Sequence, residues 1–159
     1  MQNSIIRNIF ITGFLAIVFS GILQSCEGEC VELPESLSRI NFHSIIDSVD
    51  RPTPVDSLSV YGLGREDSLL YSLRNNISFI DLPLDGNAGE SAFVLLFDNI
   101  ADTLWIEYEV IPVFESPECG FMLNFELSDA RHTINMIDSV VILINQVTSF
   151  EDTNIRIYH

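Results

Sequence analysis

Apolar and polar residues alternate along several stretches of the chain. The clearest examples are residues 105–110 and 121–127, in which every second residue is apolar. A period of two is typical of β-strands that are buried on one face. Residues 93–97 and 140–144 are apolar at every position. These two runs therefore predict central strands that are covered on both faces.

Turn-forming residues separate these segments from further short strand candidates. Arg51-Pro52-Thr53-Pro54 and Gly62-Leu63-Gly64 are two such turns. The remaining strand candidates are residues 39–46, 57–61, 69–73, 77–82 and 155–158. Eight or nine short strands at this spacing predict an all-β domain, an antiparallel β-sandwich of immunoglobulin-like architecture. We place this single domain at residues 38–159.

The first 25 residues differ from the rest and predict an export signal. Arg7 is their one charged residue, and residues 9–23 are almost wholly apolar. A run of this length is short of the roughly 20 residues that a spanning helix needs, and it fits the helical core of a signal peptide. The segment Leu23-Gln24-Ser25-Cys26 resembles a lipobox, in which the cysteine receives lipid. An ordinary signal peptide and an uncleaved anchor are the alternatives.

This interpretation divides the chain into a lipoprotein signal peptide (1–25), a lipidated tether (26–37) and the β-sandwich. The predicted partner is a lipid bilayer, reached through the acylated Cys26, and the predicted location is the cell envelope, at the outer membrane. The sequence leaves open whether the protein lies on the periplasmic or the surface leaflet. Glu27, Glu29 and Glu32 follow the cysteine. They fit either a surface-export signal or a solvated, charged tether.

The charge balance excludes one class of partner. The chain has 23 acidic residues against 7 arginines and no lysine, which gives a net charge of −16. Cleavage before Cys26 removes Arg7, and the charge then becomes 6 minus 23, or −17. Such a surface repels phosphate, so we expect no nucleic acid partner. Solubility explains the acidity, and cation binding or repulsion from an anionic membrane are the alternatives.

Three cysteines occur, Cys26, Cys30 and Cys119. If Cys26 carries lipid, the other two remain as a pair, and in an oxidising compartment a pair predicts a disulfide. A Cys30–Cys119 metal pair is the alternative, but no histidine stands nearby in the sequence to complete a zinc site.

No motif predicts catalysis or cofactor binding. His132 lies near Asp129 in the sequence, but the chain has no nucleophile turn, phosphate loop or dinucleotide fingerprint. The segment Asp85-Gly86-Asn87-Ala88-Gly89-Glu90 resembles part of a calcium loop, although a full loop is longer and has more carboxylates. A hairpin connection between Leu84 and Phe93 explains the same residues. We therefore expect no catalytic residue, no metal and no cofactor.

Asp followed by Ser or Thr and then an aliphatic residue occurs five times. The triplet resembles an O-glycosylation signal of exported proteins in some Gram-negative gut bacteria. A turn pair followed by the start of a strand is the structural alternative. The candidate acceptors are Ser48, Ser57, Ser68, Thr103 and Ser139.

Several segments together resemble a family of small, uncharacterised envelope lipoproteins from gut-type Gram-negative bacteria. They are Cys26-Glu27-Gly28-Glu29-Cys30, Val60-Tyr61-Gly62-Leu63-Gly64-Arg65, Leu82-Pro83-Leu84, Ser116-Pro117-Glu118-Cys119-Gly120-Phe121 and Asn135-Met136-Ile137-Asp138-Ser139-Val140. The resemblance implies the lipoprotein address and the two-cysteine pattern. It implies no activity.

These observations predict a membrane-anchored envelope lipoprotein that is not an enzyme. Its domain is expected to bind or scaffold an unknown envelope protein or glycan. Two alternatives stay open, an acid-assisted hydrolase and a calcium-dependent glycan-binding module. The hydrolase needs two carboxylates that face one cleft.

Overall fold

The computed structural model describes residues 35–150 and 152–159, and all regular secondary structure in this part of the chain is β-strand. The strands are β1 (Leu37–Ile46), β2 (Val49–Pro52), β3 (Leu58–Gly62), β4 (Leu69–Arg74), β5 (Phe79–Pro83), β6 (Glu90–Phe97), β7 (Ile100–Ser116), β8 (Gly120–His132), β9 (Ser139–Ile142), β10 (Gln146–Val147) and β11 (Thr153–Tyr158). Strand β1 begins one residue before the predicted start of the domain.

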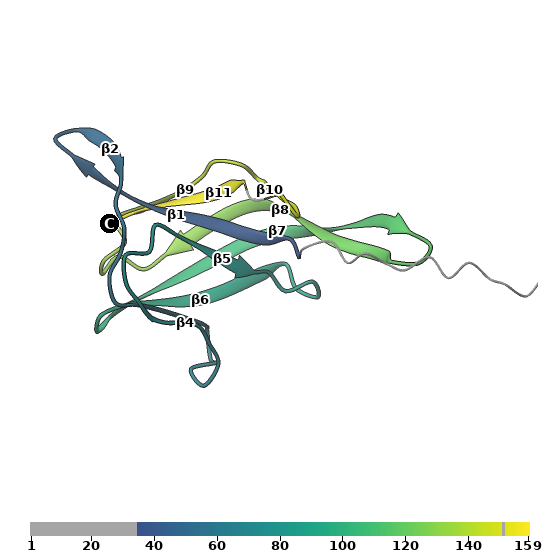
Figure 1. Cartoon of the computed structure of the whole chain (residues 1–159), viewed down its shortest axis with the longest axis horizontal. Coiled ribbons are helices and arrows are strands. Elements are labelled where there is room, and N and C mark those ends of the chain that lie inside the picture. The colour runs from purple at the N-terminus through teal and green to yellow at the C-terminus, as the bar shows by residue number, and fades with distance from the viewer. Residues whose placement is uncertain (1–34, 151) are drawn as a thin grey trace, which may run out of the picture. The chain divides into compact units, whose positions relative to one another are not determined.

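The strands form two sheets that pack face to face (Figure 1). The five-stranded sheet has the order β2-β1-β11-β9, with β5 also paired to β1, and the six-stranded sheet has the order β10-β8-β7-β6-β3-β4. The all-β sandwich predicted from the sequence is therefore confirmed. One pairing differs from a purely antiparallel plan, because β1 and β11 run parallel.

The core lies between the two sheets and is made by the alternating apolar residues of both. Phe42 of β1 contacts Phe97 of β6 edge to face, with 6.3 Å between ring centroids. Side chains with no exposed surface come from the five-stranded sheet (Ile40, Phe42, Ile80, Leu82, Ile155 and Ile157) and from the six-stranded sheet (Leu58, Val60, Leu95, Leu104 and Ile106). Burial of this apolar area, at about 25 cal/mol per Å², is the main source of stability.

The prediction that residues 140–144 form a central strand is wrong. The observed strand β9 (Ser139–Ile142) lies at the edge of its sheet and pairs with β11 alone. Val141 is exposed, while Val140 and Ile142 are half-buried against the core. The apolar run cannot distinguish a strand that is covered on both faces from an edge strand whose outer face is open.

The predicted hairpin connection between Leu84 and Phe93 is also wrong. Strand β5 pairs with β1 in one sheet, whereas β6 pairs with β3 and β7 in the other, so the connection crosses between the sheets. Tyr108 holds it in place, because its hydroxyl donates to the carbonyl of Asp85 over 3.0 Å and lies 2.7 Å from Ser91 Oγ. The glycines and polar residues of this segment therefore serve a crossover.

All eleven strands belong to one compact unit, which contains the described residues from 35 to 116 and from 120 to 159. Pro117–Cys119, between β7 and β8, do not belong to this unit. The predicted signal peptide, Cys26 and Cys30 lie outside the described residues. In the part of the chain that is described, no helix is long and apolar enough to cross a membrane.

Candidate binding surfaces

The hairpin of β7 and β8 extends past the other strands of its sheet (Figure 1). Strand β6 pairs with β7 only over residues 100–107, and β10 pairs with β8 only at Phe125 and Glu126. Beyond these positions β7 and β8 pair with each other as far as Ser116 and Gly120. The end of the hairpin therefore carries apolar residues that no other described strand covers.

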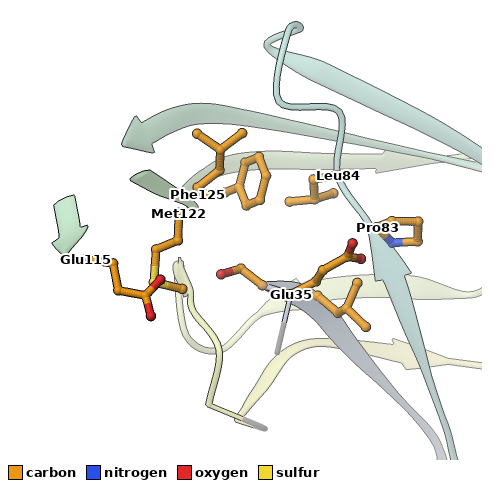
Figure 2. Close-up of a pocket in the computed structure, with 9 residues that line it drawn as sticks. Glu35, Pro83, Leu84, Glu115, Met122 and Phe125 are labelled. Carbon is orange, nitrogen blue, oxygen red and sulfur yellow. The ribbon is translucent and has the colours of Figure 1, made fainter. Parts of the chain in front are cut away.

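A hollow of about 450 Å³ lies at the base of this extension. Figure 2 shows Leu84 and Phe125 along its wall, with Glu35 and Glu115 entering from different sides. Ser36 lies at the hollow and donates a hydrogen bond to Asn124 Oδ1 over 3.0 Å. The hollow thus combines an apolar lining with two carboxylates, which suits an apolar group next to a positive charge.

A second candidate surface is the outer edge of β9. This strand has the sequence Ser139-Val140-Val141-Ile142, with no charge, no proline and no irregularity in its pairing with β11. Leu143 and Ile144, which follow, are exposed as well. Charges, prolines and irregular pairing normally hinder the addition of a strand at a sheet edge. An apolar edge strand that lacks them leaves its backbone N–H and C=O groups open to another strand.

The other edges of the sheets carry features that hinder such pairing. Strand β2 contains two charged residues and ends in a proline, and β10 has only two residues. Strand β4 pairs with β3 through two irregularities, and its Leu73 has a positive φ of 42°. Strand β5 has Asp81 and ends at Pro83. Among the described edge strands, β9 is therefore the one without protection.

A polar cluster joins three strands of the five-stranded sheet. Asp50 Oδ1 of β2 lies 2.6 Å from His43 Nδ1 of β1, and its Oδ2 accepts a hydrogen bond from Arg156 Nη1 of β11 over 2.7 Å. The hydroxyl of Tyr158 donates to the same Oδ2 over 3.2 Å. The hydrogen bond from His43 is the main reason why the pKa of Asp50 is lowered, and the Arg156 charge adds to it. The cluster fixes β2 to its sheet.

Asp102 is a buried carboxylate whose importance no motif in the sequence indicates. It has no exposed surface and accepts hydrogen bonds from Thr133 Oγ1 at 2.6 Å and from three successive backbone N–H groups, those of Asn135, Met136 and Ile137. Burial alone would raise the pKa of Asp102, but these hydrogen bonds outweigh it and the pKa is lowered. Asp102 therefore holds the loop that places Ile137 in the core.

The five predicted glycosylation acceptors differ in accessibility. Ser48, Ser68 and Ser139 are exposed, whereas Ser57 and Thr103 are half-buried. The backbone N–H of Thr103 donates to Thr133 Oγ1, next to the Asp102 site. Glycosylation at these five residues stays a prediction.

The remaining predicted residues do not converge on a site. His132 Nδ1 lies 2.8 Å from the carbonyl oxygen of Thr133, and no contact joins it to Asp129. Asp85 Oδ1 accepts a hydrogen bond from the N–H of Asn87 and so closes a local turn. Among the described residues, no group of three or more His, Cys, Asp or Glu could hold a metal ion.

Of the predicted cysteine pair, the described residues include only Cys119, in the connection between β7 and β8. Its predicted partner Cys30 lies outside them, so the Cys30–Cys119 disulfide stays a prediction.

Comparison with known proteins gives one match. The model of a family described as "Family of unknown function (DUF6452)" matches residues 57–159. The match covers β3 to β11, and so the Asp102 site, the β7–β8 hairpin and β9. No curated protein and no solved structure matches the chain.

Proposed function

On the premise that the chain belongs to this family of unknown function, we propose that it is an envelope lipoprotein whose β-sandwich binds another envelope component without catalysis. The lipid is attached at Cys26 after removal of residues 1–25. The apolar run, the small Ser25 and the cysteine support this part of the proposal. The outer membrane is the proposed location.

The observation that carries the binding role is the unprotected edge of β9. Its outer edge is free in the described part of the chain, and its residues are strong strand formers. A partner that presents an extended apolar segment can add a strand there. Backbone hydrogen bonds then supply affinity, and alternate side chains supply specificity. This mode of recognition needs no catalytic residue.

The charge of the molecule supports a basic partner. With −17 on the mature chain, attraction at long range raises the association rate of a positively charged protein. Salt screens this attraction over a Debye length of about 8 Å at physiological ionic strength. Binding is therefore expected to weaken and to slow as salt increases.

Two covalent features belong to the same proposal. We propose a Cys30–Cys119 disulfide, to be tested by alkylation of the native protein without reductant, which should then leave both cysteines unlabelled. We also propose O-glycosylation at the exposed acceptors Ser48, Ser68 and Ser139, and mild base should release that sugar from the native protein.

The binding role is tested by placing a charge on the edge strand. Val141→Lys puts a lysine on β9, where it opposes the approach of another strand. Leu70→Lys is the matched control, because Leu70 and Val141 have the same exposed fraction of 42 % and Leu70 lies on the protected strand β4. In cells that produce each tagged full-length variant, crosslinking should yield a β9-dependent complex that Val141→Lys removes and Leu70→Lys retains.

Two results would contradict the proposal. Complexes that survive Val141→Lys would show that β9 is not the binding edge. Reproducible hydrolysis of an ester, glycoside or peptide would favour the acid-assisted hydrolase. The observation in favour of that second candidate is that Glu35 and Glu115 line one hollow. The hydrolase hypothesis requires that Glu35→Gln or Glu115→Gln abolish the hydrolysis.

A further inference from the structure

The end of the β7–β8 hairpin exposes a pair of aromatic rings. Phe114 of β7 and Phe121 of β8 are cross-strand neighbours whose rings meet edge to face, with 5.4 Å between centroids. Their exposed fractions are 57 % and 68 %. Leu123, which lies on the same face of β8 as Phe121, is exposed as well. A contiguous apolar surface of this kind marks an interaction site.

These residues continue the core-facing side of the sheet. Phe121 and Leu123 keep the two-residue period of Phe125 and Leu127, which are buried. The five-stranded sheet that faces β8 ends near Phe125, because β5 ends at Pro83 and β1 begins at Leu37. Leu37 and Pro83 line the hollow together with Phe125. Leu123 still packs against Gly86 of the connection between β5 and β6. Beyond Leu123, at Phe121, no strand of the facing sheet is described.

Covalent geometry places the predicted lipid close to this surface. Cys26 precedes Glu35 by nine residues, and nine extended residues span at most about 30 Å. Glu35 lines the hollow at the base of the extension together with Leu123. From Phe125 to Phe121, the strand covers only about 13 Å. The hairpin end thus lies within reach of the bilayer that holds the acyl chains.

The other apolar hairpin end does not share this position. Ile45, Ile46 and Val49 are exposed where β1 meets β2, but β1 runs from Leu37 to Ile46, about 30 Å away along the strand. That end lies further from the point where the tether enters the domain. The end of the β7–β8 hairpin is therefore the nearer of the two apolar ends to the residue where the tether enters the domain.

The geometry points to a second membrane contact, in which Phe114 and Phe121 at the end of the β7–β8 hairpin enter the interface of the bilayer that holds Cys26. The inference rests on the proposed lipid attachment, and it adds an orientation, with the hairpin end towards the lipid and the β1–β2 end away from it. The charge of the residues around the two rings indicates which lipid headgroups the contact suits. Glu115 and Glu118 flank the rings and no Lys or Arg lies between residues 113 and 123, so the contact suits neutral headgroups.

The test uses the full-length, lipidated protein in phosphatidylcholine vesicles with brominated acyl chains, which quench tryptophan on contact. Trp105 is the one native tryptophan, and Trp105→Phe removes it. Phe121→Trp in this background reports on the hairpin end. Ile134→Trp is the control, because Ile134 is 80 % exposed and follows the opposite end of β8, about 40 Å along the strand from Gly120. We expect a blue shift and strong quenching for Phe121→Trp and neither for Ile134→Trp.

Three other results would overturn the proposed membrane contact, and they can be told apart. If mass analysis of the same sample finds acyl chains on Cys26 but the Phe121→Trp signal is not quenched, the membrane contact is wrong and the anchor stands. A blue shift without quenching shows that protein covers the rings, either another part of this chain or a second copy, and also overturns the contact. Loss of the acyl chains from the mass overturns both proposals.

Replacing part of the phosphatidylcholine with phosphatidylglycerol adds negative charge to the vesicle. Quenching of the Phe121→Trp protein should then decrease, and Glu115→Gln should restore part of it. Quenching that increases with phosphatidylglycerol would contradict the stated lipid preference.

Discussion

At the scale of single residues, Asp102 is the one acidic side chain that is buried among the described residues. A buried carboxylate is costly unless hydrogen bonds compensate for the lost water. Here one hydroxyl and three backbone N–H groups point at it, and they belong to the loop between β8 and β9. Asp102 thus links β7 to a loop more than thirty residues later in the chain.

Asp102→Ala should therefore destabilise the domain strongly. It leaves these donors buried without an acceptor, and we expect the free energy of unfolding to fall by about 3 kcal/mol or more. The exposed Asp67 offers the control, because Asp67→Ala should leave the denaturation midpoint unchanged. Urea unfolding of both variants measures the difference. Equal midpoints for Asp102→Ala and the parent protein would refute this role.

The difference in stability between the parent protein and Asp102→Ala should depend on pH. The pKa of Asp102 is lowered from its ordinary value of 3.8, so its contribution is complete above that value and is lost as the pH falls through the lowered pKa. The gap in stability between the parent and Asp102→Ala should therefore shrink in acid.

The sequence predicted the burial of Ile106 and Tyr108 at this scale, because their alternation is local and core packing follows it. It did not predict the role of Asp102. The Asp102-Thr103-Leu104 triplet looks the same as the four others, and the donors that distinguish it come from residues 133–137. No local signal encodes a contact over that separation.

At the scale of elements, β2 shows how a short strand can be held at an edge. It has four residues, all exposed, so burial contributes little to its position. Its pairing with β1 is supported by Asp50, which contacts His43 of β1 and Arg156 and Tyr158 of β11. Asp50 is therefore the side chain that joins β2 to two other strands, in addition to the backbone pairing of β2 with β1.

Asp50→Ala should release β2 while the sandwich stays folded. Amide hydrogen exchange of residues 49–51 should become faster, and exchange in the buried part of β8 should not change. Acid should have the same effect on the parent protein, because the lowered pKa of Asp50 means that its stabilisation is lost as the pH falls through that value. Unchanged exchange in β2 would show that its backbone pairing suffices.

The positions of most strands could be predicted at this scale, because hydrophobic period and turn residues are local properties. Their place in the sheets could not. Residues 140–144 are as apolar as residues 93–97, yet the first run lies at an edge and the second in the interior of a sheet. Whether a strand lies at the edge or in the interior of a sheet depends on which strands pair with it. The pattern of apolar residues in a single sequence does not indicate that pairing.

At the scale of the whole molecule, the two sheets leave different surfaces at different places. The hairpin end and its hollow lie where the chain enters the domain at Glu35. The edge of β9 belongs to the five-stranded sheet. The sandwich itself was predictable from the number and spacing of short strands. The parallel pairing of β1 with β11 was not, because it joins the first and last described strands.

The central claim is that the protein is anchored in the envelope through a lipid on Cys26, because the proposed binding role and the membrane contact both depend on that address. Intact-mass analysis of protein extracted from the native membrane tests it most directly. We predict a mature chain that begins at Cys26 and carries acyl chains. A chain that retains residues 1–25, or that begins at another residue without lipid, would contradict the claim.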